Sequence, residues 1–176
     1  MDREQINLIE ASLQRLSGRM DFVPIDEILL TRLVMFLSND LSAMLEQFIR
    51  PFGLAEGEFR VLTALYSQPD GVANPTELCS RAVQSPANMS RICDALVSRD
   101  LITRDLSEQD RRKMVLTIND KGAQLVRDLL PSMFAALRES FGEFTSDEKK
   151  CLIDQIKRLA HSLEKVMASA AAVSNV

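Results

Sequence analysis

The sequence predicts a mostly α-helical protein with one small β-hairpin, an α+β fold class. Of its 176 residues, 46% are hydrophobic, 5% aromatic and 26% charged, which is typical of a globular chain rich in helix formers. Apolar residues recur at helical spacing before and after a short central segment. Only that segment, residues 101–118, resembles a pair of strands. A chain of this length can bury one core, or one core together with an oligomer interface.

The first half of the chain predicts three helices and a minimal strand. Residues 4–17 carry apolar side chains at helical spacing. A longer apolar stripe begins after Pro24 and ends near Pro51, which predicts a helix of about 23 residues, roughly 35 Å long. A third helix is expected over residues 56–67, closed by a turn rich in proline, aspartate and glycine. The dipeptide Val72-Ala73 is long enough only for an edge strand.

Two short helices follow, and each has its own start signal. Asn74 precedes Pro75, and Ser85 precedes Pro86. In both pairs the first residue is a favoured N-cap and the proline occupies the first helical position. The second start follows so soon that the connecting turn has only three or four residues, which is the spacing of a helix-turn-helix. In that motif the second helix can enter the major groove of DNA.

Residues 101–106 and 113–118 are rich in β-forming residues and predict two strands. The polar loop between them is too long for a two-residue hairpin turn and ends in Arg111 and Arg112. Arginine at a hairpin tip can reach the narrow minor groove beside a recognition helix. The sequence therefore predicts a winged helix-turn-helix, with this hairpin as the wing.

Two further helices are expected after the wing. Asn119 caps a helix that crosses Pro131, where we expect a kink rather than a break. Thr145 and Glu148 form a capping box that begins a final long helix. The small residues of the tail, 168–176, are expected to fray.

The long helices outside the helix-turn-helix have more apolar surface than one chain can cover. This predicts a symmetric homodimer, with dimerisation regions at residues 1–53 and 121–176 and a DNA-binding domain at residues 54–120. A two-fold dimer presents two recognition helices about one helical turn apart, so the DNA operator should be pseudo-palindromic.

The wing carries a resemblance to a known family. Asp110-Arg111-Arg112, followed by Leu116-Thr117 and Lys121-Gly122, resembles the wing signature of MarR-type transcriptional regulators. The stretch at residues 27–33 and the total length are similar to the EmrR (MprA) subgroup of multidrug-resistance regulators.

Two positions depart from the family pattern. Val83 stands where relatives often have glycine in the turn, and Asp100 where they often have glycine after the second helix. Aspartate tolerates a left-handed backbone conformation better than a β-branched valine does.

The resemblance implies a ligand-responsive regulator that binds DNA and represses multidrug efflux or stress genes. Small phenolic or anionic aromatic ligands would release it from the operator. Two alternatives remain open, which are a cysteine-based redox-responsive regulator and a winged-helix protein-docking module without DNA binding.

The residues expected to contact DNA lie on the second helix and the wing. Asparagine can read adenine and arginine can read guanine by paired hydrogen bonds, while a capped helix N-terminus favours phosphate. The alternative is a capped, solvated helix face. The expected set is Ser85, Pro86, Asn88, Ser90, Arg91, Arg111 and Arg112.

The resemblance also implies a ligand pocket between the dimer region and the winged helix. Mostly apolar walls with a few polar groups suit aromatic anions. The alternative is core packing for each aromatic side chain and a salt bridge for the arginine. The candidate residues are Arg32, Phe36, Phe59, Tyr66 and Phe134.

Net charge is −4, but residues 81–113 hold seven basic against five acidic residues, which leaves −6 for the rest of the chain. The basic excess thus lies on the predicted DNA-binding segment. There is a single histidine, His161, and no catalytic motif, metal-ligand cluster or cofactor motif, so we expect neither an enzyme nor a metal or cofactor.

The cysteines and the hydropathy pattern bear on the compartment. Cys79, Cys93 and Cys151 are odd in number and form no CxxC pair, which fits a reducing compartment. Cys79 and Cys93 lie in the helix-turn-helix pair, where small buried residues are a simpler interpretation than redox sensors. No run of eighteen apolar residues and no signal pattern is present, so we expect a cytoplasmic protein without a membrane segment.

Overall fold

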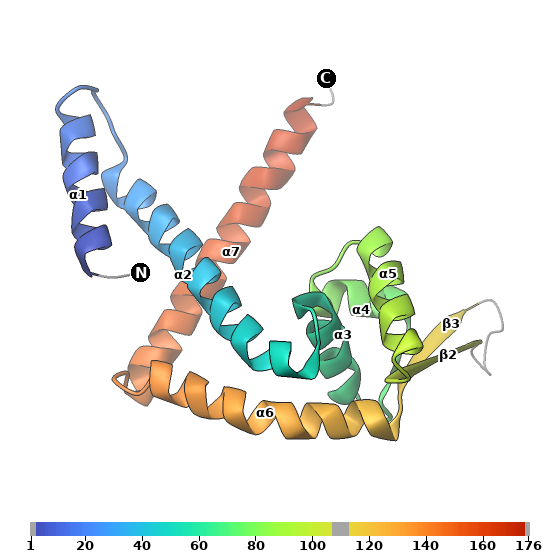
Figure 1. The fold of residues 1–176 in the computed structure, drawn as a ribbon. Coiled ribbons are helices and arrows are strands. Elements are labelled where there is room, and N and C mark those ends of the chain that lie inside the picture. Colours follow the sequence, from blue (N-terminus) through green and yellow to red (C-terminus); the bar gives the residue numbers. More distant parts are fainter. Residues whose placement is uncertain (1–2, 107–112, 175–176) are drawn as a thin grey trace. The chain divides into compact units, whose positions relative to one another are not determined.

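The computed structural model describes residues 3–106 and 113–174 and has two compact units, Met1–Met133 and Phe134–Val176 (Figure 1). The elements of the first unit precede the helix that crosses into the second. They are α1 (Arg3–Ser17), α2 (Ile25–Ile49), the 3-10 turn η1 (Arg50–Phe52), α3 (Glu56–Tyr66), β1 (Val72–Ala73), α4 (Pro75–Ala82), α5 (Pro86–Ser98), β2 (Ile102–Leu106) and β3 (Met114–Ile118). The crossing helix is α6 (Asp120–Ser140), and α7 (Ser146–Ser174) follows it.

The fold class predicted from the sequence is confirmed. Within the described residues, three strands form one antiparallel sheet in the order β1-β3-β2, and every other element is helical. The two-residue strand expected at Val72 and Ala73 pairs with β3, with Ala73 opposite Leu116. On the other side of β3, Ile102 lies opposite Ile118.

The core lies where α3, α4 and α5 pack against one another and against the sheet. Leu62, Leu78, Leu96 and Leu116 come from four of these elements, and each is fully buried. Because this cluster also includes Ile49 at the end of α2, it joins the first long helix to the helix-turn-helix. Burial of such side chains contributes about 1.5–3 kcal/mol each.

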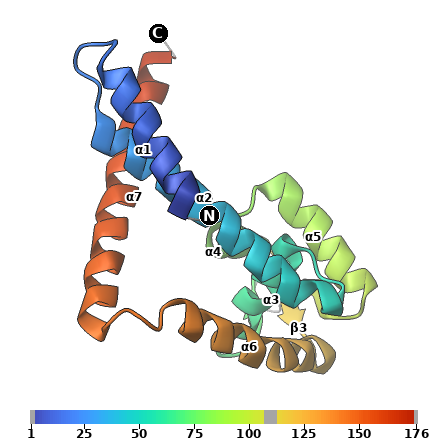
Figure 2. The same cartoon turned by 60° about the vertical axis from the view of Figure 1, so that its left-hand side comes forward.

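The helix α2 has an uncovered apolar side. α1 contacts it (Figure 2). Leu13 of α1 is buried. Beyond that contact a row of apolar residues is exposed on α2, namely Leu30, Val34, Met35, Leu37 and Leu41. The stretch Ile25–Phe52 is long and apolar enough to cross a membrane by length and composition, although no uninterrupted apolar run of eighteen occurs. Helices that pack in soluble proteins pass the same test, so this is weak evidence for a membrane.

α6 begins at a tight junction with the sheet. Asn119 Oδ1 accepts a hydrogen bond from the Gly122 N–H at 2.9 Å, so the predicted cap is present. A Cβ atom at Gly122 would overlap the carbonyl oxygen of Leu101, which is why a glycine is needed there. The helix continues through Pro131 without a break.

α7 starts as predicted and ends later than predicted. The Glu148 carboxylate accepts hydrogen bonds from the Thr145 N–H and Oγ1, both at 2.8 Å. The helix then runs to Ser174, whereas fraying was expected from residue 168. The small side chains there include several alanines, and alanine has the highest helix propensity, so the missing apolar stripe does not end the helix.

Candidate nucleic-acid interface

The two short helices begin at the residues that the sequence predicts. Asn74 Oδ1 accepts a hydrogen bond from the Glu77 N–H at 2.9 Å, at the start of α4. Ser85 Oγ accepts one from the Asn88 N–H at 3.3 Å, at the start of α5. Each bond satisfies a backbone donor that a helix start leaves unpaired. Local sequence therefore sets where both helices of the motif begin.

In the turn between them, one valine has a left-handed backbone conformation. Val83 has φ 54° and ψ 53°, and the Gln84 N–H donates to the Cys79 carbonyl oxygen at 2.9 Å to close the end of α4. The position that glycine often occupies in relatives therefore keeps its left-handed geometry here. Asp100, at the second such position, has φ 56°. A non-glycine residue in this region carries about 1–3 kcal/mol of strain.

The two sides of α5 have different roles. Met89, Ile92, Cys93 and Leu96 are buried in the core. The side chains expected to contact DNA lie on other faces, where Ser85, Pro86, Ser90 and Arg91 are exposed and Asn88 is half-buried. The helix is thus anchored on one side and presents polar groups on another.

Asn88 is held between two neighbours on its own side of the helix. Its Nδ2 donates to Gln84 Oε1 in a short hydrogen bond, and its Oδ1 accepts from Arg91 Nη2 at 3.0 Å. The amide is therefore oriented before any ligand binds. Arg91 remains exposed, with donors beyond the one that Asn88 uses.

Arg99, the residue that follows α5, is bonded to the end of η1, the turn that follows α2. Its guanidinium donates to the carbonyl oxygens of Phe52 and Gly53, both at 2.8 Å, and lies 3.3 Å from Glu58 Oε2. Lys121 Nζ in turn donates to the Arg99 carbonyl oxygen at 2.8 Å. These contacts connect the end of α5 to η1, to the start of α3 and to α6. Sequence reasoning missed Arg99 because its partners lie more than forty residues away.

The wing is attached to α5 by an ion pair. Arg104 Nη2 on β2 lies 2.8 Å from Asp94 Oδ1 on α5. Sequence reasoning missed this pair as well, because two polar residues on separate elements carry no local signal of contact. Arg111 and Arg112, predicted to contact DNA, lie outside the described residues.

The five residues predicted to bind a ligand lie in different settings. Arg32 and Phe36 are exposed on α2, Tyr66 is exposed at the end of α3, and Phe59 is buried in the core. Phe134 is exposed in the second unit. None of the five lines the two cavities described here. One of these, of about 290 Å³, is lined by Arg60, Thr63, Ala64, Ser67 and Arg81.

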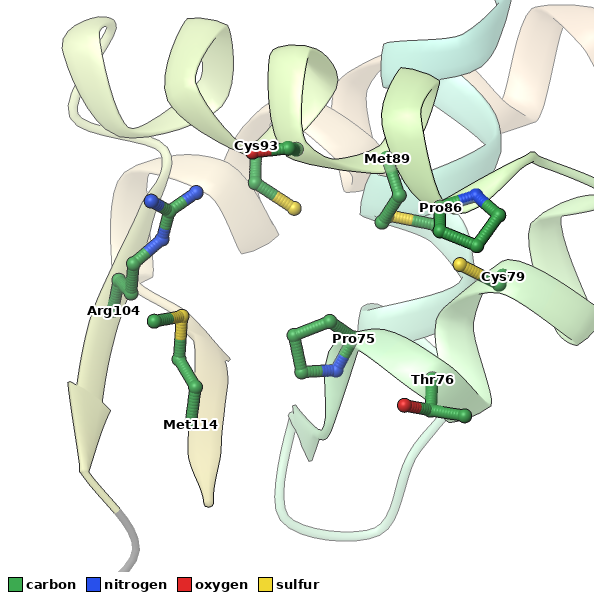
Figure 3. Close-up of a pocket in the computed structure, with 9 residues that line it drawn as sticks. Pro75, Thr76, Cys79, Pro86, Met89, Cys93, Arg104 and Met114 are labelled. Atoms are coloured by element: carbon green, nitrogen blue, oxygen red, sulfur yellow. The ribbon is translucent and has the colours of Figure 1, made fainter. Parts of the chain in front are cut away.

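The other cavity, of about 300 Å³, lies beside α5 (Figure 3). Its walls come from α4, α5 and the two wing strands, and they include Cys79, Cys93 and Arg104. Burial raises the pKa of the Cys93 thiol, and the charge of Arg104 offsets this only in part. A raised pKa lowers the thiolate fraction, and the thiolate is the form that oxidants attack. This disfavours Cys93 as an oxidant sensor.

Among residues 3–106 and 113–174, no three His, Cys, Asp or Glu side chains gather as metal ligands. The one histidine, His161, is exposed on α7 with its Nδ1 3.5 Å from Glu164 Oε2. Neither observation offers a catalytic arrangement in this part of the chain.

The sequence has clear relatives. Residues 52–113 match the model of the MarR family. Over 155 residues the chain is 32% identical to the transcriptional repressor MprA of Escherichia coli, and the match covers 88% of this chain and 86% of that protein.

Solved structures have the same fold. AbsC, a MarR family transcriptional regulator from Streptomyces coelicolor, matches over 83% of this chain and 99% of its own, with a TM-score of 0.75 and 21% identity. A second MarR family regulator from the same organism, crystallised in complex with DNA, matches over 82% of this chain and 91% of its own, with a TM-score of 0.74 and 21% identity.

Proposed function

Because the chain belongs to the MarR family of transcriptional regulators, we propose that it binds a pseudo-palindromic operator as a homodimer and is released by small phenolic or anionic aromatic ligands. The family consists of regulators rather than enzymes. The observation that carries the proposal is the polar face of α5, with Asn88 oriented between Gln84 and Arg91.

The chemistry of this face suits base recognition. An oriented asparagine amide matches the paired donor and acceptor of adenine, and an exposed arginine matches guanine. Ser85 and Pro86 place the start of α5 where its backbone N–H groups can meet a phosphate. Arg111 and Arg112 would add minor-groove contacts at the wing. Together these are base contacts and phosphate contacts of the kind that a winged helix makes.

Exposed apolar side chains support the homodimer. On α7 they recur along the helix at Leu152, Ile153, Ile156, Leu159, Leu163, Val166 and Met167. α2 has its own exposed row. Contiguous apolar surface of this extent marks an interface in a soluble protein. A second copy of the chain is the economical partner because a two-fold axis covers the same surface on both chains.

Arg32 and Phe36 support the ligand proposal. They lie four residues apart on α2, which places them on one helical face, and both are exposed. A cation beside an aromatic ring suits a phenolate or carboxylate on an aromatic ring. A ligand that prefers one spacing of the recognition helices would shift the dimer away from the spacing that fits the operator.

The likeness to MprA, a transcriptional repressor, favours repression over activation. We propose efflux or stress genes as targets on the basis of the sequence resemblance described above. A cytoplasmic location follows from the same assignment, since the operator lies there. We propose that the apolar side of α2 serves the dimer rather than a membrane.

The test is DNA binding measured by fluorescence anisotropy, using the DNA upstream of the gene that encodes this chain. We expect tight, salt-dependent binding, and release by salicylate-like compounds. Arg91→Ala should weaken binding by about 10–100-fold, and Asn88→Ala should also change sequence preference. Arg15→Ala is the matched control because it removes an exposed arginine from α1.

Equal losses in Arg91→Ala and Arg15→Ala would mean that only overall charge matters and would refute the assignment of α5. Binding that is independent of salt would refute the DNA proposal itself. A docking module without DNA binding predicts neither salt dependence nor an effect of Asn88→Ala.

A further inference from the structure

Arg99 lies where the winged helix joins the helices that we propose form the dimer. It directly follows α5, and its guanidinium contacts the joint between η1 and α3, through which the chain passes from α2 into the helix-turn-helix. Its backbone carbonyl oxygen accepts a hydrogen bond from Lys121 Nζ at the start of α6, the helix that leads to α7. The two connections between the winged helix and the dimerisation helices therefore meet at this residue.

The joint after η1 turns on a glycine. Gly53 has φ 65° and ψ 25°, in the left-handed region, and glycine is the residue whose backbone rotates most freely. Arg99 donates to the carbonyl oxygens of Phe52 and Gly53, both at 2.8 Å. These two carbonyls belong to the peptide groups on either side of the Gly53 Cα atom. The guanidinium thus restrains both backbone torsions of the one residue at which the joint could bend most easily.

The same guanidinium is bound to the start of α3. Glu58 Oε2 lies 3.3 Å from Arg99 Nη1 and also accepts a hydrogen bond from the Ala55 N–H at 3.0 Å. The Arg99 side chain is 32% exposed and that of Glu58 is 15% exposed, so both are partly shielded from water. Hydrogen bonds of a planar guanidinium fix direction, whereas apolar packing between the same elements is non-directional. Arg99 therefore holds an angle at this joint.

That angle determines where the DNA-reading residues lie. α5 has 13 residues and is about 20 Å long, with Asn88 and Arg91 toward its start and Arg99 beyond its end. A turn of about 10° at Arg99 would move the start of α5 by about 3.5 Å, which is close to the rise of one base pair. We propose that Arg99 is a positioning residue, which fixes the winged helix against the dimerisation helices and so selects the spacing between operator half-sites. This inference rests on the proposed binding of an operator by a homodimer.

The test compares three duplexes, using the full chain and fluorescence anisotropy at constant salt. They are the operator footprinted by the wild-type chain, the same operator with one base pair inserted at its centre, and a single half-site. The insertion should weaken wild-type binding by about 100-fold, because only one recognition helix then reaches its half-site.

Arg99→Met should respond differently to the three duplexes. It should bind the unaltered operator about 10-fold more weakly than the wild-type chain, since a freely turning winged helix is less preorganised. It should bind the lengthened operator as well as the wild-type chain does, so the insertion penalty falls to about 10-fold. Binding of the half-site should stay within about two-fold of wild type, because the polar face of α5 is unchanged.

Three variants serve as controls. Arg99→Lys keeps the charge but replaces the guanidinium fork by one donor atom, so its insertion penalty should lie between those of Arg99→Met and wild type. Arg127→Gln removes an exposed arginine that bonds Gln124 within α6, and Leu65→Ala destabilises the buried core of α3. Both should keep the wild-type penalty, under conditions in which circular dichroism shows every variant folded.

Several results would overturn the positioning role. A wild-type insertion penalty in Arg99→Met would do so, and so would an equal fall of the penalty in Leu65→Ala, which would attribute it to general loss of stability. Equal losses of half-site and operator affinity in Arg99→Met would show that spacing is not involved. If Arg99→Met fails to fold, Arg99→Lys decides. In all these cases the wild-type chain still binds its operator, so the proposed function stands. A wild-type chain that binds every spacing equally would instead refute the two-fold operator, and this inference with it.

Discussion

Replacing Val83 by glycine should make the protein more stable. The backbone of Val83, in the turn between α4 and α5, has a left-handed conformation with φ 54°. We take the cost of this conformation for a β-branched residue as about 2 kcal/mol. The side chain is 75% exposed, so its removal loses only about 0.5 kcal/mol of burial. Glycine has more conformational freedom in the unfolded chain, which lowers the free energy of unfolding by about 0.5–1 kcal/mol. The free energy of unfolding should therefore rise by about 0.5–1 kcal/mol in Val83→Gly.

The assay is urea unfolding followed by circular dichroism, at one protein concentration so that dimerisation is held constant. With an m-value of about 2 kcal/mol per molar, the midpoint of Val83→Gly should rise by about 0.3–0.5 M. Val97→Gly is the matched control, because Val97 lies within the right-handed α5 and is 39% exposed. That variant should lose about 1–2 kcal/mol from lower helix propensity and lost burial.

The two valine-to-glycine changes are therefore expected to have opposite signs. If both variants are destabilised, the turn at Val83 does not carry the strain that its backbone angles imply. An equal midpoint for Val83→Gly and the wild-type chain would lead to the same conclusion.

Three further perturbations test other parts of the structure. Ile156→Glu on α7 should raise the dimer dissociation constant at least about 100-fold in sedimentation experiments, because a two-fold axis removes the apolar burial of this residue from both chains. Lys157→Glu, the control, should have little effect. A monomeric wild-type chain would contradict the proposed dimer. Arg99→Met should lower the free energy of unfolding by about 2–4 kcal/mol, measured in urea, because two carbonyl oxygens and a carboxylate lose a charged donor. A loss below about 0.5 kcal/mol, the size of a surface change, would show that the contacts of Arg99 with η1 and α3 do not stabilise the fold. Hydrogen bonds from Thr145 lower the pKa of Glu148, so their stabilisation is complete above the ordinary value of 4.5 and is lost as pH falls through the lowered value. The thermal midpoints of wild type and Glu148→Gln should therefore converge in acid, and a constant gap would contradict the assigned cause.

The sequence predicted the elements that local chemistry determines. The starts of α4 and α5 followed from two N-cap and proline pairs, and β1 followed from a dipeptide after a strong turn signal. The late end of α7 was missed because small residues carry no apolar period although alanine favours a helix.

Contacts between distant elements were not predictable in the same way. The pairing of Arg104 with Asp94 and the contacts of Arg99 with the end of η1 depend on how helices and strands pack. The cavity beside α5 was missed for the same reason, since its lining residues come from four separate elements and no spacing in the sequence links them. Only a tertiary structure brings such groups together.

The separation of roles around α5 has a consequence for how such a protein can change. Met89, Ile92, Cys93 and Leu96 are buried and hold this helix against the core, and none of them lies on the side that we propose contacts DNA. Exchanges at the solvent-facing positions thus leave the hydrophobic anchor intact and cost little folding energy. Under the proposed function, a lineage can therefore change its DNA sequence preference by substituting a few residues on one surface of α5, while the buried side of the helix stays the same.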